Sequence, residues 1–327
     1  MSNATRSVFE ETYLRKQSLK TGILNFSKKL SWLDVFVFVC ALGDFFCNFA
    51  FLLTKRVREM KIRFMSLGSG SSGNCYYLGT DMYGILIDAG IGIRTVKKIF
   101  KERGLSLSTI RAVFITHDHA DHIKAVGHLG EKHNIPIYTT PEIHQGIRRS
   151  YCVTEKLSAL HICYIQKEET VEIGDFSITC FEVPHDGTDN VGYCVCIDRK
   201  TFTFITDIGH ITDTAARYIS RANYLIMEAN YDESMLQMGP YPQHLKQRIA
   251  GERGHMCNKV MAEFIANHFP KDLKYLWLCH LSKDNNHPEL AYKTVELALK
   301  EKNIIAGKDV EVIPLKRTLP SEMYCFE

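Results

Sequence analysis

The chain has 327 residues with 45% hydrophobic and 24% charged positions, the composition of an ordinary globular protein that can bury a large core as one big domain or two small ones. The formal net charge of +3 permits a nucleic-acid partner but does not by itself indicate one. The 11 cysteines are odd in number and include no C-x-x-C pair, which argues against a disulfide framework and predicts a cytoplasmic protein.

The first 59 residues differ in character from the rest of the chain. Residues 35–53 are almost wholly apolar and just reach the length of a membrane span. Asp44 lies at the centre of this stretch, where a carboxylate costs about 2.5–3.5 kcal/mol on insertion scales. Two interpretations remain open: a weak anchor that tethers a cytoplasmic catalytic domain, or upstream sequence before a true start at Met60. We favour the second, and expect residues 1–59 to be a non-core extension and residues 60–327 to form the catalytic domain.

From Met60 onward, short apolar strands alternate with helices. In the first half we expect strands at residues 62–67, 75–78, 84–87, 112–116 and 136–139, and helices at residues 93–103, 123–133 and 141–149. In the second half we expect a strand pair within residues 172–183, strands at 192–197, 202–206, 224–227, 275–278 and after 310, and helices at 242–250, 256–268 and 288–300. Strands followed by helices, twice over, predict two sheets packed face to face between helical layers.

A cluster of three histidines and two aspartates directly follows the fourth of these strands. His117 and His119 alternate on one side of an extended segment, so both can reach one metal ion. Asp121 and His122 lie past the bend and can serve a second ion. Histidine and aspartate are ligands that suit zinc, manganese or iron. The alternative is a polar turn with Asp118 or Asp121 as the N-cap of a helix, but the H-x-H-x-D-H pattern favours a metal site.

This H-x-H-x-D-H pattern resembles the signature of the metallo-β-lactamase superfamily. Within that superfamily, Ser69–Cys75 and Cys279–Asn286 are similar to the YycJ type of bacterial nuclease-like proteins. The resemblance covers the chain from about Met60 to the end and implies an αββα sandwich with two divalent ions, Zn²⁺ or Mn²⁺.

The resemblance also implies a set of ligands, each standing at the end of a predicted strand or in the motif itself. It assigns His117, His119 and His185 to one ion, and Asp121, His122 and His280 to the other. It assigns Asp207 to both ions. Asp88 resembles an aspartate that orients ligands by accepting their hydrogen bonds.

Two ions held close together can share a hydroxide that attacks phosphorus, and the same chemistry suits lactone, thioester or other ester hydrolysis almost as well. The short interval from His185 to Asp207 leaves little room for the flexible arm of tRNase Z enzymes, and that from Asp207 to His280 is too short for the inserted domain of β-CASP nucleases. The resemblance therefore implies a compact exonuclease that cleaves DNA from 5′ to 3′. A small-molecule ester hydrolase remains the alternative, and a membrane-tethered binding protein is disfavoured.

Glu228 and His255 resemble the glutamate and histidine of tRNase Z, although Met256-Cys257 replaces Ser-Thr after the histidine. We expect His255 to protonate the leaving group and Glu228 to keep its imidazole protonated, and we count Asp121 with them as catalytic. The alternative for His255 is a purely structural hydrogen bond at a helix start. Six basic residues either contact DNA phosphates or lie on solvated helix faces: Lys97, Lys98, Lys101, Arg103, Arg148 and Arg149.

Overall fold

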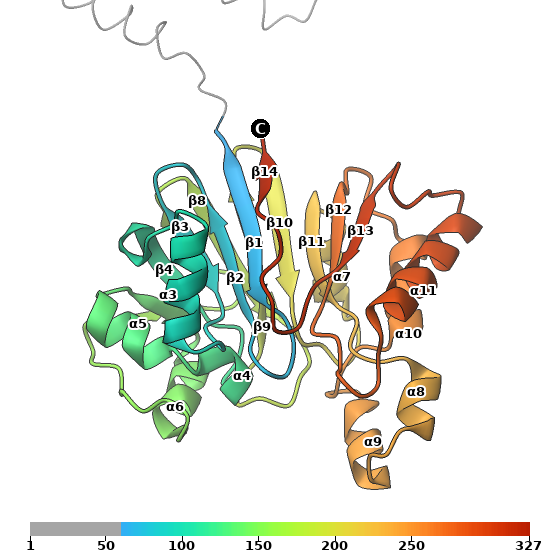
Figure 1. Ribbon diagram of the computed structural model, residues 1–327, viewed down its shortest axis with the longest axis horizontal. Helices are drawn as coiled ribbons and strands as arrows, with labels where there is room; N and C mark the ends of the chain where they lie inside the picture. Colours follow the sequence, from blue (N-terminus) through green and yellow to red (C-terminus); the bar gives the residue numbers. More distant parts are fainter. Residues whose placement is uncertain (1–59) are drawn as a thin grey trace, which may run out of the picture. The chain divides into compact units, whose positions relative to one another are not determined.

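The computed structural model describes residues 60–327. The predicted extension at residues 1–59, with its apolar stretch, lies outside the described residues, so its domain boundary stays a prediction. From residue 60 to residue 327 the chain forms two seven-stranded sheets with helices on their outer faces (Figure 1). The predicted αββα sandwich is confirmed. No helix in this part of the chain combines the length and the apolar character needed to cross a bilayer.

The first sheet has the strand order β14-β1-β2-β3-β4-β5-β6. Its strands are β1 (Ile62–Gly68), β2 (Cys75–Gly79), β3 (Gly84–Ile87), β4 (Ile110–Phe114), β5 (Ile137–Thr139), β6 (Ile162–Tyr164) and β14 (Tyr324–Phe326). Strands β3 to β6 run parallel, so their carboxyl ends meet at one edge. Three helices bury apolar side chains in the core on the outer side of this sheet: α3 (Ile93–Glu102), α5 (Val126–His133) and α6 (Pro141–Arg149).

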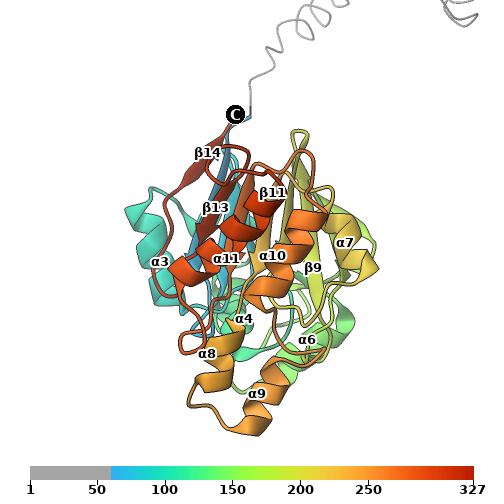
Figure 2. The same cartoon turned by 90° about the vertical axis from the view of Figure 1, so that its right-hand side faces the viewer.

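The second sheet has the order β13-β12-β11-β10-β9-β8-β7. Its strands are β7 (Thr170–Ile173), β8 (Phe176–Glu182), β9 (Val191–Ile197), β10 (Lys200–Ile205), β11 (Tyr224–Glu228), β12 (Tyr275–Cys279) and β13 (Glu311–Pro314). Strands β10 to β13 are parallel, and β8 shares their direction because both β8 and β10 pair antiparallel with β9. A second apolar cluster joins this sheet to α7 (Asp213–Ile219), α10 (Asn258–Asn267) and α11 (Pro288–Glu301) (Figure 2).

Aromatic side chains hold the two sheets together. The ring centroid of Phe64 on β1 lies 4.4 Å from that of Trp277 on β12 and 6.1 Å from that of Phe204 on β10. All three side chains are fully buried. Burying a side chain of this kind stabilises the fold by about 1.5–3 kcal/mol. This contact fixes the two sheets face to face and so sets the distance between their carboxyl edges.

The elements differ from the prediction mainly around the metal motif. The helix predicted at residues 123–133 is two helices, α4 (Ala120–Ile123) and α5. The backbone N–H of Ala125 donates to the carbonyl of Ala89, which breaks the helix between them. Short elements went unpredicted, namely β6, β14, α7 and α8 (Glu233–Met238). Helices α8 and α9 (Gln243–Ile249) project at the end of the sheets where α4 lies (Figure 1).

Candidate metal centre

The structure brings together all seven residues predicted as metal ligands. His117, His185, Asp207 and His280 follow the ends of β4, β8, β10 and β12, and the ends of these strands face one another across the sandwich. Their ligand atoms fall into overlapping groups whose members lie within 4.8 Å of one another. Two of these groups are the predicted ones: His117, His119 and His185, and Asp121, His122 and His280.

In the first group, imidazole nitrogens face one another at close range. The Nε2 atom of His117 lies 3.1 Å from Nδ1 of His119. His185 donates from Nδ1 to the carbonyl of Gly254 at 2.8 Å, which leaves its Nε2 as a bare lone pair. That Nε2 atom is buried and has no hydrogen-bond partner among residues 60–327. Such an orphaned lone pair is costly unless a cation is bound.

The second group meets the first at Asp207, which is only 3% exposed. In this group His280 Nε2 lies 3.3 Å from Asp121 Oδ2, and His122 Nε2 lies 3.5 Å from the same oxygen. Asp207 Oδ2 lies 3.2 Å from His122 Nε2, while its Oδ1 lies 3.8 Å from His185 Nε2. Asp207 therefore touches both groups, which is the placement expected of a carboxylate shared between two ions.

The electrostatics of the centre fit bound cations. Burial lowers the pKa of His117 well below its usual range, and the neighbouring His122 charge lowers it further. Burial raises the pKa of Asp207, but the His280 and His122 charges more than offset this, so its pKa falls well below normal. The metal-free centre thus combines a neutral imidazole at His117 with an ionised carboxylate at Asp207, while His122 and His280 carry protons that a bound metal would displace. His and Asp in this proportion suit Zn²⁺ and similar divalent ions. The residues present fit the predicted metals.

Asp88 lies behind the centre and holds His122 and the residue before the motif, Thr116, in place. It is fully buried and accepts a hydrogen bond from His122 Nδ1 at 2.7 Å. It also accepts from the backbone N–H of Thr116 at 2.9 Å. Its backbone is left-handed (φ 60°), which is uncommon for a residue with a side chain and turns the chain sharply after β3. Asp88 thus contacts His122 directly, and its role in orienting that ligand stays a prediction.

A glycine lets this turn approach the motif closely. A Cβ atom on Gly90 would lie 1.5 Å from the carbonyl oxygen of Asp121, so no other residue fits there without moving the loop.

The N-capping alternative is wrong for both aspartates of the motif. His119 is the N-cap residue of α4 and makes no side-chain cap, while Asp118 accepts hydrogen bonds from Thr188.

Glu228 and His255 also lie at this centre. His255 Nδ1 donates to Glu228 Oε1 at 2.7 Å, and His280 Nδ1 lies 3.1 Å from the same oxygen. The other oxygen, Oε2, accepts the backbone N–H groups of Ile208 and Met256 at 2.8 and 3.1 Å. Asp207, Glu228, His255 and His280 form a further group able to hold an ion, so the structure leaves both a ligand role and a proton-transfer role open to this pair.

Three polar residues at the centre were not predicted. Asn74 Nδ2 lies 2.9 Å from His122 Nε2. Asp186 Oδ1 lies 3.4 Å from His119 Nε2, and its Oδ2 accepts from Arg248 Nε at 2.7 Å. One signal in the sequence pointed to Asp186, which directly follows the predicted ligand His185. No signal in the sequence pointed to Arg248, which lies in α9.

A hollow of about 290 Å³ opens over the donor groups. Its lining combines loop, motif and α9 residues, namely Ser71, His119, Ala120, Asp121, Asp207, Arg248, His255 and His280.

The chain between His185 and Asp207 forms only β9 and β10 with short loops, so no arm is inserted there. The ammonium groups of Lys97, Lys98 and Lys101 lie on the exposed face of α3.

Comparisons with known proteins agree with this geometry. A family described as "Beta-lactamase superfamily domain" matches residues 83–276. The chain is 31% identical to the exodeoxyribonuclease YycJ of Bacillus anthracis, over 81% of this chain and 99% of that protein. It is 34% identical to the exodeoxyribonuclease WalJ of Streptococcus pneumoniae, over 78% of this chain and 94% of that protein. The solved structure of the metallo-beta-lactamase fold protein YhfI from Bacillus subtilis has a TM-score of 0.61 at 18% identity, covering 81% of this chain and 100% of that one.

Proposed function

The chain belongs to the metallo-β-lactamase superfamily and is a hydrolase of that family, and from this premise we propose that it is a DNA exonuclease that works from 5′ to 3′ with two divalent ions. The observation that carries the proposal is the pair of donor groups joined through Asp207. The similarity to two exodeoxyribonucleases along nearly their whole lengths supports DNA as the substrate.

Three histidines would hold one ion and an aspartate with two histidines the other, with Asp207 shared between them. The ligands of the first ion would be His117, His119 and His185, and those of the second Asp121, His122 and His280. When bound, Zn²⁺ or Mn²⁺ at such a site supplies positive charge to a phosphodiester and makes water a stronger nucleophile near neutral pH. Asp88 would hold the His122 ring in the orientation and tautomer that leave Nε2 free to ligate.

We assign a positioning role to Glu228. Its Oε2 is occupied by two backbone N–H groups and its Oε1 by two imidazoles, so the carboxylate has no lone pair directed freely at an ion. By accepting from Nδ1 of His280 it leaves Nε2 of that ring for the metal. By accepting from Nδ1 of His255 it directs the other nitrogen of His255 toward the hollow, which His255 lines.

His255 would then protonate the leaving group. Cleavage of a phosphodiester expels a sugar alkoxide, which is a poor leaving group, so a proton donor beside it accelerates the reaction. Burial lowers the pKa of His255, but the Glu228 carboxylate raises it by more, and the resulting pKa lies above the usual value. A histidine whose pKa is raised and whose side chain lines the substrate hollow has the properties that this role requires.

The rim of the hollow favours an anionic substrate. The Arg248 guanidinium lines it and is more than half exposed, so it can approach a phosphate while still paired with Asp186. A neutral lactone or thioester would gain nothing from this cation. We therefore rank phosphodiester hydrolysis above ester hydrolysis.

The test is activity of the metal-reconstituted protein on DNA labelled at its 5′ or its 3′ end. The proposal predicts release of labelled mononucleotides at once from the 5′ label and only late from the 3′ label. The reverse order would overturn the polarity, and intact DNA beside a hydrolysed lactone would overturn the nuclease assignment.

A further inference from the structure

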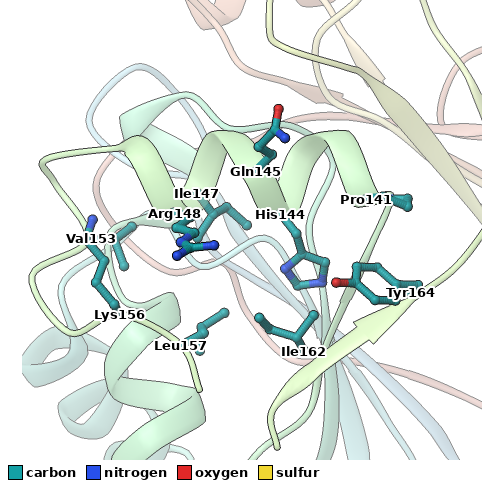
Figure 3. Close-up of a pocket in the computed structure, with 10 residues that line it drawn as sticks. All are labelled: Pro141, His144, Gln145, Ile147, Arg148, Val153, Lys156, Leu157, Ile162 and Tyr164. Carbon is teal, nitrogen blue, oxygen red and sulfur yellow. The ribbon is translucent and has the colours of Figure 1, made fainter. Parts of the chain in front are cut away.

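A second hollow, of about 310 Å³, lies beside α6, and Figure 3 shows the side chains that line it. Helix α6 packs against the motif through Gly146, where a Cβ atom would lie 1.9 Å from Asp118 Oδ2. His144 and Arg148 each lie two residues from Gly146, about 200° around the helix axis, and line the hollow (Figure 3). One helix therefore separates this hollow from the metal centre.

The hollow has an apolar part and an aromatic edge. Four aliphatic side chains line it: Ile147, Val153, Leu157 and Ile162. Tyr164, at the end of β6, is 58% exposed, and its ring stands edge-on to that of His144 with centroids 5.4 Å apart. An exposed aromatic ring above an apolar floor is a platform on which a planar heterocycle can stack.

One buried polar atom in this hollow has no partner. His144 is only 6% exposed, and its Nε2 donates to the carbonyl of Cys163 at 3.0 Å. Its Nδ1 is therefore an acceptor, and it has no hydrogen-bond partner within residues 60–327. Burial lowers the pKa of His144, which keeps the ring neutral and this acceptor available. A buried acceptor without a partner marks a place where a ligand N–H can bind.

The charge at the opposite end of the hollow is positive. Figure 3 shows the side chains of Arg148 and Lys156 at one end and Tyr164 at the other. No carboxylate is among the ten residues that line the hollow. The Arg148 guanidinium makes no ion pair or hydrogen bond with any residue that the structure describes. An unpaired guanidinium facing an acid-free hollow is suited to a phosphate.

We propose that this hollow binds one nucleotide unit, with its base against Tyr164, a base N–H donated to His144 Nδ1 and its phosphate beside Arg148 and Lys156. The inference rests on the proposed nuclease function and deepens it, since a single strand with splayed bases fits such a site and a stacked duplex does not. The nucleotide can come from the substrate strand, after it passes α6, or from free mononucleotide. The two sources share this chemistry and differ in what they do to catalysis.

The experiment compares Tyr164→Ala and Arg148→Ala with two matched controls, Tyr151→Ala and Arg94→Ala. Tyr151 is 93% exposed, Arg94 is exposed on α3, and both lie outside the lining of the hollow. Binding is measured in the holoenzyme for a single-stranded oligonucleotide, the matching duplex and free dAMP. Hydrolysis of bis-p-nitrophenyl phosphate, which is too small to reach across α6, reports the integrity of the metal centre.

We expect Tyr164→Ala to weaken single-strand binding by about fivefold or more, the usual effect of losing one base–aromatic stack. We expect Arg148→Ala to weaken it and to reduce the dependence of log affinity on log salt by about 0.7, the value for one phosphate contact on a single strand. The controls and the bis-p-nitrophenyl phosphate rate should not change. If dAMP binding is lost with the same two variants, the hollow takes free nucleotide as well; if dAMP never binds, the substrate strand is the source.

The proposal is overturned if Tyr164→Ala and Arg148→Ala bind single strands as the wild type does, while the wild type still degrades DNA. That result would leave the nuclease function intact. A wild type that hydrolyses bis-p-nitrophenyl phosphate but neither binds nor degrades DNA would remove the nuclease function, and this inference would fall with it.

Discussion

His255 Nδ1 lies 2.7 Å from Glu228 Oε1, and this short contact orients the histidine toward the hollow over the donor groups. If His255 protonates a sugar alkoxide, its loss should affect substrates according to their leaving groups. We expect His255→Ala to slow DNA cleavage by about 10²–10⁴-fold, the usual contribution of general acid catalysis. Bis-p-nitrophenyl phosphate should be spared, because nitrophenolate leaves without a proton.

His210→Ala is a suitable control, since His210 is exposed and only its Nδ1 contacts a backbone carbonyl, that of Glu252. An equal loss on both substrates would show instead that His255 supports the structure of the centre or ligates an ion.

Asp207 touches both donor groups, so its removal should affect both ions. We expect Asp207→Ala to lower bound metal and to reduce hydrolysis by more than about 100-fold, since even outer partners of a metal ligand account for 10–100-fold. Elemental analysis of the purified variant gives the metal content, and circular dichroism checks the fold. Full metal occupancy in a folded variant would rule out the shared role.

Asp88 should tune metal affinity without contacting an ion. Replacing it by asparagine keeps the volume but weakens its bond with His122 Nδ1, which is now 2.7 Å long. We expect Asp88→Asn to weaken metal binding by about 10–100-fold, measured by competition with a chelator. Added metal should restore activity. If activity stays low at saturating metal, Asp88 acts in a different way.

Metal binding should release protons. In the metal-free protein, burial lowers the pKa of His280, but Asp207 and Asp121 raise it by more, to well above its usual value. The pKa of His122 is likewise raised, by Asp88 and Asp207 against burial. Because the pKa of each histidine is higher in the folded than in the unfolded protein, its pairing with carboxylates stabilises the metal-free protein. This stabilisation is complete when the pH lies below the pKa of the unfolded state. It is lost as the pH rises through the pKa of the folded state.

Because a metal needs neutral imidazoles, binding must expel these protons and must weaken as pH falls. Calorimetric titration near pH 7 in two buffers of different ionisation enthalpy should therefore give different binding enthalpies. Identical enthalpies in the two buffers would mean that His122 and His280 are already neutral.

Both described sheets and all seven predicted metal ligands lie within residues 60–327. We therefore expect a chain that starts at Met60 to fold, to bind metal and to match the full-length kcat/KM. If that chain aggregates while the full-length protein partitions into membranes, the first 59 residues are an anchor.

The sequence predicted the site unevenly, for physical reasons. Four of the predicted ligands lie close together in the sequence and can be recognised by their spacing, namely His117, His119, Asp121 and His122. Asp207 and the two later histidines stand alone in the sequence, so only the resemblance assigned them. Asp186 and Arg248 were not predicted because their contact joins a loop to helix α9, far away in the chain, and such a contact leaves no local pattern.

The fold was predictable where elements are long and apolar. Three-residue strands such as β6 and β14 show no period, and a six-residue helix such as α8 gives too few turns to reveal one. The break between α4 and α5 depends on a hydrogen bond from Ala125 to Ala89, which is a tertiary contact. The hollow beside α6 likewise combines residues from a helix, a strand and a loop, so its composition became visible only in three dimensions.

The most direct test of the account is hydrolysis by metal-reconstituted protein of 5′-end-labelled single-stranded DNA, beside a panel of lactones and thioesters, with Asp207→Ala as the metal-site control. We predict metal-dependent release of 5′-terminal mononucleotides by the wild type, none by the variant, and no turnover of the panel. Turnover of a lactone or thioester with the DNA left intact would contradict the account.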